Sequence, residues 1–239
     1  MPAAYTLDVA DVVELEGRIA RDGTPLYDLM QRAGAALAQA VEERHAQPCE
    51  VVVLAGSGNN GGDGWVAAEL LAARGHRATL VTPRPAQALT AEPARTAALH
   101  AAAADPAPRI LVDPAAGELH DLLAGADAAI DAMLGTGFSH DTLREPYATW
   151  TSELNAAHAA GLHVIAADVP SGVSAQTGAG AEPHVAADET VTMMVLKPGV
   201  AGAACGRVAV ADIHDLAPYR DFLEERAVSG PTRPPTPDR

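Results

Sequence analysis

Short apolar, β-branched runs recur along the chain and alternate with longer amphipathic or alanine-rich stretches. A strand buried on both faces of a sheet has such a run, whereas a helix covering the sheet repeats its apolar residues every three or four positions. The alternation predicts parallel strands joined by crossover helices on both faces, and therefore an α/β fold. The runs lie at 51–54, 79–81, 110–112, 128–130, 163–166 and 190–195, with a last one at 207–211.

Two helices are predicted before the first strand. A valine-rich face marks the first, and Thr24-Pro25 opens the second, because threonine caps a helix and proline fits its first turn. Residues 215–228 have the pattern of a short last helix, after which the sequence becomes rich in proline. We therefore expect one domain over 1–228 and a disordered, proline-rich tail over 229–239.

Charge and cysteine content narrow the class of protein. The formal net charge is −15. Proteins bind nucleic acids and anionic membranes through clustered Lys and Arg, so this composition argues against both partners. Cys49 and Cys205 form no disulfide or metal-ligand pattern. The N-terminus has no signal sequence, and no apolar stretch is long enough to span a membrane. We expect buried, reduced thiols in a cytoplasmic protein.

The strongest local feature is the segment GSGNNGGDG, from Gly56 to Gly64, which follows the first strand and precedes a helix-compatible run at 65–73. Strand, glycine loop and helix in this order present backbone N–H groups to a phosphate. The embedded GxGxxG is weak evidence for a dehydrogenase, because the next strand ends in Thr82-Pro83 without the acidic residue that binds a ribose. A P-loop also requires Lys and then Ser or Thr directly after its last glycine. Here the two positions after Gly61 hold Gly62 and Asp63.

The oxygen-rich side chains of this segment favour a ligand site. The plainer alternative is a tight turn whose Asp63 favours a helix N-terminus, but two adjacent asparagines and an aspartate suit a hydroxylated ligand or a hard cation. Asp131 and Asp168 also end apolar strands before flexible loops. Such aspartates are often turn or cap residues, yet the carboxyl ends of parallel strands meet at one edge, so three polar loops converge on one crevice.

Taken together, these motifs resemble the NAD(P)H-hydrate epimerases, the YjeF N-terminal domain family. The likeness rests on GNNGGDG at 58–64, DAMLGTG at 131–137 with REP at 144–146, DVPSG at 168–172, GTPL at 23–26, LMQRAG at 29–34 and KPG at 197–199. It implies a Rossmann-like, three-layer α/β/α sandwich with a mostly parallel sheet after an N-terminal helical prelude. It also implies a homodimer that interconverts the R and S epimers of hydrated NADH or NADPH.

The resemblance assigns individual residues as well. Those that it places at the substrate are Asn59, Asn60, Gly61, Gly62, Asp63, Gly135, Thr136, Gly137, Phe138, Ser139, His140, Asp141 and Asp168. Those that it places at a potassium ion are Asn60, Asp131 and Ser171. Two neutral oxygens and one carboxylate are a suitable set for a large, weakly demanding cation.

The predicted function is therefore a cofactor-repair epimerase. Inversion of the hydrated carbon can proceed by loss and re-addition of water through an iminium, or by ring opening through an aldehyde. Either route needs a group that exchanges a proton at neutral pH, and we predict Asp168 in this catalytic role. A separate NAD(P)H-hydrate dehydratase is expected to consume the S form downstream, because a chain of this length leaves no room for that domain.

Two other function classes share these features. One is a non-catalytic nucleotide-binding or scaffolding protein, since fold alone does not fix function, and the other is an NAD-dependent dehydrogenase, which the absent ribose-binding acid opposes. The intact aspartate and asparagine set favours the enzyme. Lys197 is the only lysine of the chain, and we expect it at the surface, where lysines usually lie, without a catalytic role.

Overall fold

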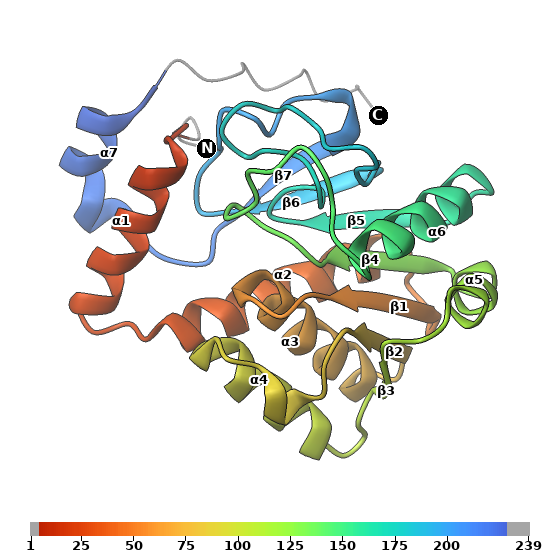
Figure 1. Cartoon of the computed structure of the whole chain (residues 1–239). Helices are drawn as coiled ribbons and strands as arrows, with labels where there is room; N and C mark the ends of the chain where they lie inside the picture. The colour runs from red at the N-terminus through yellow and green to blue at the C-terminus, as the bar shows by residue number, and fades with distance from the viewer. Residues whose placement is uncertain (1–4, 229–239) are drawn as a thin grey trace.

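A seven-stranded, wholly parallel sheet runs through the computed structural model, which describes residues 5–228 (Figure 1). The strand order is β3-β2-β1-β4-β5-β6-β7. The strands are β1 (Glu50–Ala55), β2 (Arg77–Thr82), β3 (Arg109–Val112), β4 (Ala128–Ala132), β5 (His163–Ala167), β6 (Glu189–Met193) and β7 (Arg207–Ala211). The predicted α/β class is confirmed, and every strand pairing in this sheet is parallel.

Helices cover both faces of the sheet. One face carries α2 (Leu26–Arg44), α3 (Asn59–Ala73) and α4 (Glu92–Ala103), and the other carries α5 (Ala116–Ala124) and α6 (Tyr147–Ala159). Successive side chains of a strand point to opposite faces. Val51 and Val53 accordingly pack in the core under α2 to α4, whereas Val52 and Leu54 pack in the core under α5 and α6. This double burial explains why the central strands β1, β4 and β5 read as nearly continuous apolar runs.

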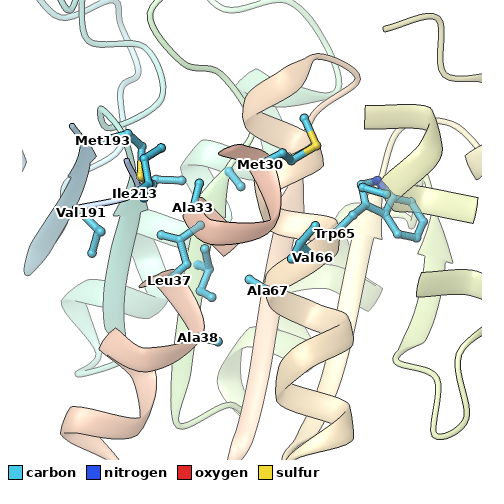
Figure 2. Packing of buried hydrophobic residues seen from close by; sticks show 14 of the residues in the cluster. Met30, Ala33, Leu37, Ala38, Trp65, Val66, Ala67, Val191, Met193 and Ile213 are labelled. Atoms are coloured by element: carbon cyan, nitrogen blue, oxygen red, sulfur yellow. The ribbon is translucent and has the colours of Figure 1, made fainter. Parts of the chain in front are cut away.

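Helix α2 is part of the core and fixes the position of α3. A Cβ added to Gly34 of α2 would lie 2.5 Å from the Cβ of Val66 on α3, so the two helices approach as closely as glycine permits. On its other side α2 turns Leu37 toward β6, which presents Val191 and Met193 (Figure 2). The predicted helical prelude therefore braces the helix that carries the glycine motif.

Two helices lie beyond the carboxyl ends of the strands, α1 (Val9–Arg21) and α7 (Arg220–Arg226) (Figure 1). The chain before α1 pairs with the segment after β6, where Leu7 N donates to Leu196 O at 3.0 Å. Arg226 of α7 donates to Asp11 of α1 at 2.9 Å. Helix α1 is thereby held next to the edge of the sheet at which β6 ends.

Element boundaries differ from the sequence predictions in several places, and three of these differences change an element most. Strand β6 ends at Met193 and not at 195, because Met194 adopts a left-handed φ of 59°. The predicted last helix divides into a 3-10 turn (Ala217–Tyr219) and α7. Two further 3-10 turns lie elsewhere in the chain, at Ala86–Ala88 and Ala203–Cys205. Helix α3 begins at Asn59, six residues before the predicted start at 65.

Two further expectations concern the ends of the chain and the membrane. The predicted disordered tail, 229–239, lies outside the described residues. Within residues 5–228, no helix combines the length and the apolar character that crossing a bilayer requires.

Candidate functional site

The candidate site lies at the carboxyl edge of the sheet, between β1 and β4. Strand β1 pairs with β2 on one side and with β4 on the other, and the helices that follow β1 and β4 cover opposite faces. Open α/β sheets bind ligands in the crevice that such a switch point leaves beyond the strand ends. The glycine motif follows β1, Asp131 lies in β4, and Asp168 follows β5, so all three predicted loops lie at this edge.

Helix α3 presents its N-terminus to this crevice. A Cβ on Gly56 would lie 1.8 Å from Met133 O, and one on Gly61 would lie 1.9 Å from Gly56 O, so the close approach of loop and helix requires glycine at both positions. The first turn closes with Gly62 N donating to Gly58 O at 3.1 Å. The backbone N–H groups of residues 59–61 and the positive end of the helix dipole are consequently available to an anion.

Asp131 and Ser171 form a buried, hydrogen-bonded pair. Asp131 is 0 % exposed; its Oδ1 accepts from Ser171 Oγ at 2.6 Å and its Oδ2 from Ser171 N at 2.7 Å. Met133 N also donates to Oδ1, at 3.2 Å. Burial raises the pKa of Asp131 to about 6, although these hydrogen bonds from Ser171 and Met133 lower it. A carboxylate in this position needs a cation or a proton to offset its lost hydration.

Asn60 lacks the partners that Asp131 has. Both the oxygen and the nitrogen of its side-chain amide are buried, and neither has a hydrogen-bond partner among the described residues. Gly135 lies against it, since a Cβ on Gly135 would be 3.2 Å from Asn60 Oδ1. Buried polar atoms nearly always have a partner, so this amide oxygen, next to the loop that leaves β4, is suited to complete the coordination of a ligand.

The second predicted substrate segment, 135–141, leaves β4 as a partly exposed loop. Phe138 N donates to Gly135 O at 3.0 Å, which closes a turn, and the Phe138 and His140 rings meet edge to face with centroids 6.0 Å apart. Asp141 O accepts a hydrogen bond from Glu182 N at 3.4 Å. The loop therefore extends from Asn60 to the segment that follows Ser171.

Asp168 is held by a buried lysine. Directly after β5, Asp168 adopts a left-handed φ of 66°, and its Oδ1 accepts from Thr192 Oγ1 and Met193 N, both at 3.1 Å, and from the Lys197 ammonium. Lys197 is 1 % exposed, so the expectation of a surface lysine is wrong. Its charge is compensated by a carboxylate 29 residues away, a partner that no local pattern could reveal.

Two more carboxylates belong to this cluster, Asp63 of α3 and Glu16 of α1. Burial raises the pKa of Asp63 well above its ordinary range, and the charges of Asp168 and Glu16 add to this rise. Burial also raises the pKa of Glu16, with a contribution from Asp168, whereas Lys197 opposes the rise at both groups. Sequence reasoning missed Glu16 because it precedes every motif and only the tertiary position of α1 brings it to the site.

A hollow at the opposite, amino-terminal edge of the sheet is a weaker candidate. Its volume is about 690 Å³, and its ionisable lining comprises Glu50, Glu118 and Asp121 against a single Arg109. Three carboxylates and one guanidinium would repel the phosphates of a dinucleotide. The carboxyl edge, which has the helix N-terminus, suits an anionic ligand better.

Comparison with known families agrees with this geometry. Residues 26–199 match the family described as YjeF-related protein N-terminus, which is most of the chain. The chain belongs to this family. The matched range contains Asn60, Asp131, Asp168, Ser171 and Lys197, whereas α1 lies before it.

Several similar proteins align along most of the YjeF-related chain. The NAD(P)H-hydrate epimerase of Limosilactobacillus fermentum is 37 % identical over 201 residues, which cover 82 % of this chain and 89 % of that protein. The NAD(P)H-hydrate epimerase of Pirellula staleyi is 36 % identical over 205 residues, with 82 % and 86 % covered. The bifunctional NAD(P)H-hydrate repair enzyme Nnr of Escherichia coli is 34 % identical over 200 residues, which are 82 % of this chain but 36 % of that enzyme.

A solved structure shares the fold. The crystal structure of the yeast protein ynu0 superposes with a TM-score of 0.72, at 24 % sequence identity, over 81 % of this chain and 82 % of that one. The Rossmann-like arrangement that the sequence resemblance implies is thus confirmed.

Proposed function

We propose that the protein is an NAD(P)H-hydrate epimerase, which interconverts the R and S forms of hydrated NADH and NADPH. The observation that carries this proposal is the gathering of Asn60, Asp131 and Asp168 around the N-terminus of α3 in a chain of this family. Relatives with this name are 36–37 % identical over 86–89 % of their own lengths. A non-catalytic scaffold remains the alternative function, but it has no need of an ion pair and further carboxylates at its ligand crevice.

The dinucleotide is held by local groups, since the net charge of −15 repels it at long range. Its anionic phosphates are suited to the N–H groups of residues 59–61 at the N-terminus of α3. The amides and hydroxyls of 135–141 border the same crevice and can bind ribose and ring substituents. The helix dipole and the backbone donors therefore attract the anionic dinucleotide, which the net negative charge of the side chains repels.

In the reaction, Asp168 is the proton-transfer group. A proton passes from its carboxyl to the hydroxyl of the hydrated carbon, the C–O bond breaks with its electron pair leaving on water, and the ring nitrogen's lone pair forms an iminium. Water then adds to the opposite face, and its surplus proton returns to Asp168 through solvent. Atoms and charge balance, because one water leaves and one enters. The ring-opening route through an aldehyde uses the same proton transfer.

Potassium is the cation that we assign to Asn60, Asp131 and Ser171. The side chains fit this assignment. Asn60 offers a buried amide oxygen that has no partner within residues 5–228, and Asp131 offers a buried carboxylate that requires a counter-charge. When bound, the cation would neutralise Asp131 and contribute positive charge to the phosphate-binding edge. Asp131 and Ser171 would still hold the two loops together through their mutual hydrogen bonds.

The cellular setting completes the proposal. We expect a separate NAD(P)H-hydrate dehydratase to act on the S epimer, in keeping with relatives named as bifunctional repair enzymes. We also propose a homodimer, as the family resemblance implies, and a cytoplasmic location, because both cysteines are free thiols. Sedimentation and the redox state of the thiols in the cell test these two points.

The test is incubation with the isolated R epimer of hydrated NADH, with appearance of the S epimer followed by chromatography. Protein-dependent conversion above the spontaneous rate is expected. Binding of the dinucleotide without any conversion would favour the scaffold instead.

A further inference from the structure

The ammonium group of Lys197 has no donor left for a substrate. It carries three N–H donors. They point to Asp168 Oδ1, to Thr192 Oγ1 at 3.0 Å and to Met193 O at 3.1 Å. The side chain is 1 % exposed. Any contribution of Lys197 to the reaction must therefore pass through the groups that it holds.

The two oxygens of Asp168 differ in their surroundings. Oδ1 accepts three hydrogen bonds, from Lys197 Nζ, Thr192 Oγ1 and Met193 N. Among residues 5–228, no protein group donates to Oδ2, and the side chain keeps 13 % of its surface exposed at the crevice edge. The carboxylate is thus fixed through one oxygen and open at the other.

The backbone shows that this arrangement is imposed on the chain. Asp168, one member of the ion pair, and Met194, which precedes the other member in the segment after β6, are both left-handed, with φ of 66° and 59°. Non-glycine residues in this region are strained and persist where their surroundings fix them, which occurs frequently at functional sites. A pair that served stability alone would not need strain in both of the segments that carry it.

We propose that Lys197 is a positioning residue, which fixes Asp168 through Oδ1 and so makes Oδ2 the atom that transfers the proton. This inference rests on the proposed epimerase function. Lys197 also supplies a buried positive charge beside Asp168, and this charge acts on Asp63 of α3 and Glu16 of α1 as well. Without it Oδ1 would keep only the donors of Thr192 and Met193, and the carboxylate would be held less firmly beside two neighbouring acids.

The test is a double-mutant cycle with Lys197→Met and Asp168→Asn. Loss of orientation at a reacting group costs on the order of 10²-fold in rate, so Lys197→Met is expected to lower kcat by about that factor while KM changes less than about threefold. In the Asp168→Asn background the same change should add almost no further loss, because Lys197 acts through Asp168. Equal losses in both backgrounds, or a rise in KM at constant kcat, would overturn the proposal.

The pH profile supplies a readout that a merely structural lysine would not move. Removal of the cation disfavours ionisation of the neighbouring carboxylates Asp63 and Glu16, whose pKa values the charge of Lys197 lowers. Because the proposed reaction starts from a protonated Asp168, kcat should fall at high pH, and this high-pH limb of log kcat should move to higher pH in Lys197→Met. Arg207→Met breaks the ion pair between Arg207 on β7 and Glu189 on β6; it is the matched control and should leave the profile in place. An unmoved limb in Lys197→Met would contradict the positioning role.

Two measurements keep the proposal testable if a variant fails to fold or the reaction is absent. Thr192→Val retains the volume but removes one donor to Oδ1, and it should lower kcat by about tenfold, again only when Asp168 is present. A crystal structure of Lys197→Met needs no substrate, and the Asp168 carboxylate should be rotated in it. An unchanged carboxylate would refute the positioning role, whereas wild-type protein that never epimerises would refute only the proposed function.

Discussion

At the scale of residues, the site assigns different tasks to carboxylates of one chemical type. Asp131 is wholly buried and bonded to Ser171, a setting that requires a counter-charge. Oδ1 of Asp168 accepts a hydrogen bond from the Lys197 ammonium, whereas its Oδ2 is left for the ligand. The difference in environment, more than residue identity, separates a cation ligand from a proton-transfer group.

Glu16 gives a pH-dependent prediction. Burial and the charge of Asp168 raise its pKa in the folded protein. A carboxyl group with a higher pKa when folded binds its proton more tightly in that state, so its ionisation opposes folding as pH rises above the unfolded value. Glu16→Gln removes this penalty. We expect it to raise Tm relative to wild type at pH 8 and to lose that advantage at pH 5.

Glu14→Gln on the same helix is the control for Glu16. A hydrogen bond from Arg18 lowers the pKa of Glu14, so neutralising it should bring no gain in Tm at pH 8. The measurement is the Tm of wild type and both variants at pH 5 and pH 8. A Glu16→Gln protein that is less stable than wild type at pH 8, but not at pH 5, would show that Glu16 is stabilised as an anion.

At the scale of elements, the first turn of α3 depends on glycine. Gly61→Ala would place a Cβ 1.9 Å from Gly56 O, and forcing a methyl group into a packed site costs about 1–3 kcal/mol. We expect Gly61→Ala to lower stability by that amount and to weaken dinucleotide binding, because the N–H groups of residues 59–61 move. Urea unfolding and a binding titration measure the two effects.

Gly117→Ala on α5 is the matched control for Gly61. No atom lies within 4 Å of a Cβ built at Gly117, and alanine favours a helix over glycine by about 1 kcal/mol. That variant should be as stable as wild type or more so and should bind normally. Equal effects of the two substitutions would mean that the start of α3 does not depend on close packing.

The sequence predicted the elements better than their ends. The central apolar runs could be predicted as strands because burial on both faces requires apolar residues, and this requirement is visible locally, whereas the edge strands β3 and β7 are only partly buried. The start of α3 was misplaced because glycines disfavour a helix by propensity, whereas here contacts with Met133 and Met30 decide. The extra length predicted for β6 did not allow for Met194, whose left-handed backbone ends the strand.

Prediction of the site shows the same division. The loops at Asp131 and Asp168 could be placed at one edge, since parallel strands align their carboxyl ends. The burial of Lys197 and the arrival of Glu16 could not be foreseen, because each depends on contacts between segments far apart in the sequence. Motifs thus indicate which loops form a site, and the tertiary fold determines which outside groups complete it.

At the scale of the whole molecule, an excess of negative charge surrounds a site for an anionic dinucleotide. We expect potassium to stabilise the protein beyond its effect on ionic strength, because it would neutralise Asp131 in the folded state alone. At a concentration of about 100 Kd the gain is about 2.7 kcal/mol. Each kcal/mol corresponds to about 2–4 °C in Tm for a chain of this size.

The potassium prediction is measured as Tm in potassium chloride against choline chloride at equal ionic strength. Asp131→Asn should abolish the difference between the two salts, whereas Arg207→Met, far from the cluster, should retain it. Identical melting temperatures of the wild-type protein in both salts would count against a potassium site at these residues.

The most direct test of the account is the approach to epimer equilibrium from both sides. Wild-type protein, added separately to pure R and to pure S hydrated NADH, should bring both samples to one common ratio, because a catalyst changes rates and leaves the equilibrium in place. General acid–base catalysis is worth about 10²- to 10⁴-fold, so folded Asp168→Asn should slow both approaches by that factor while binding the dinucleotide almost normally. Wild-type protein that binds the dinucleotide yet leaves both samples at the spontaneous rate would contradict the epimerase function.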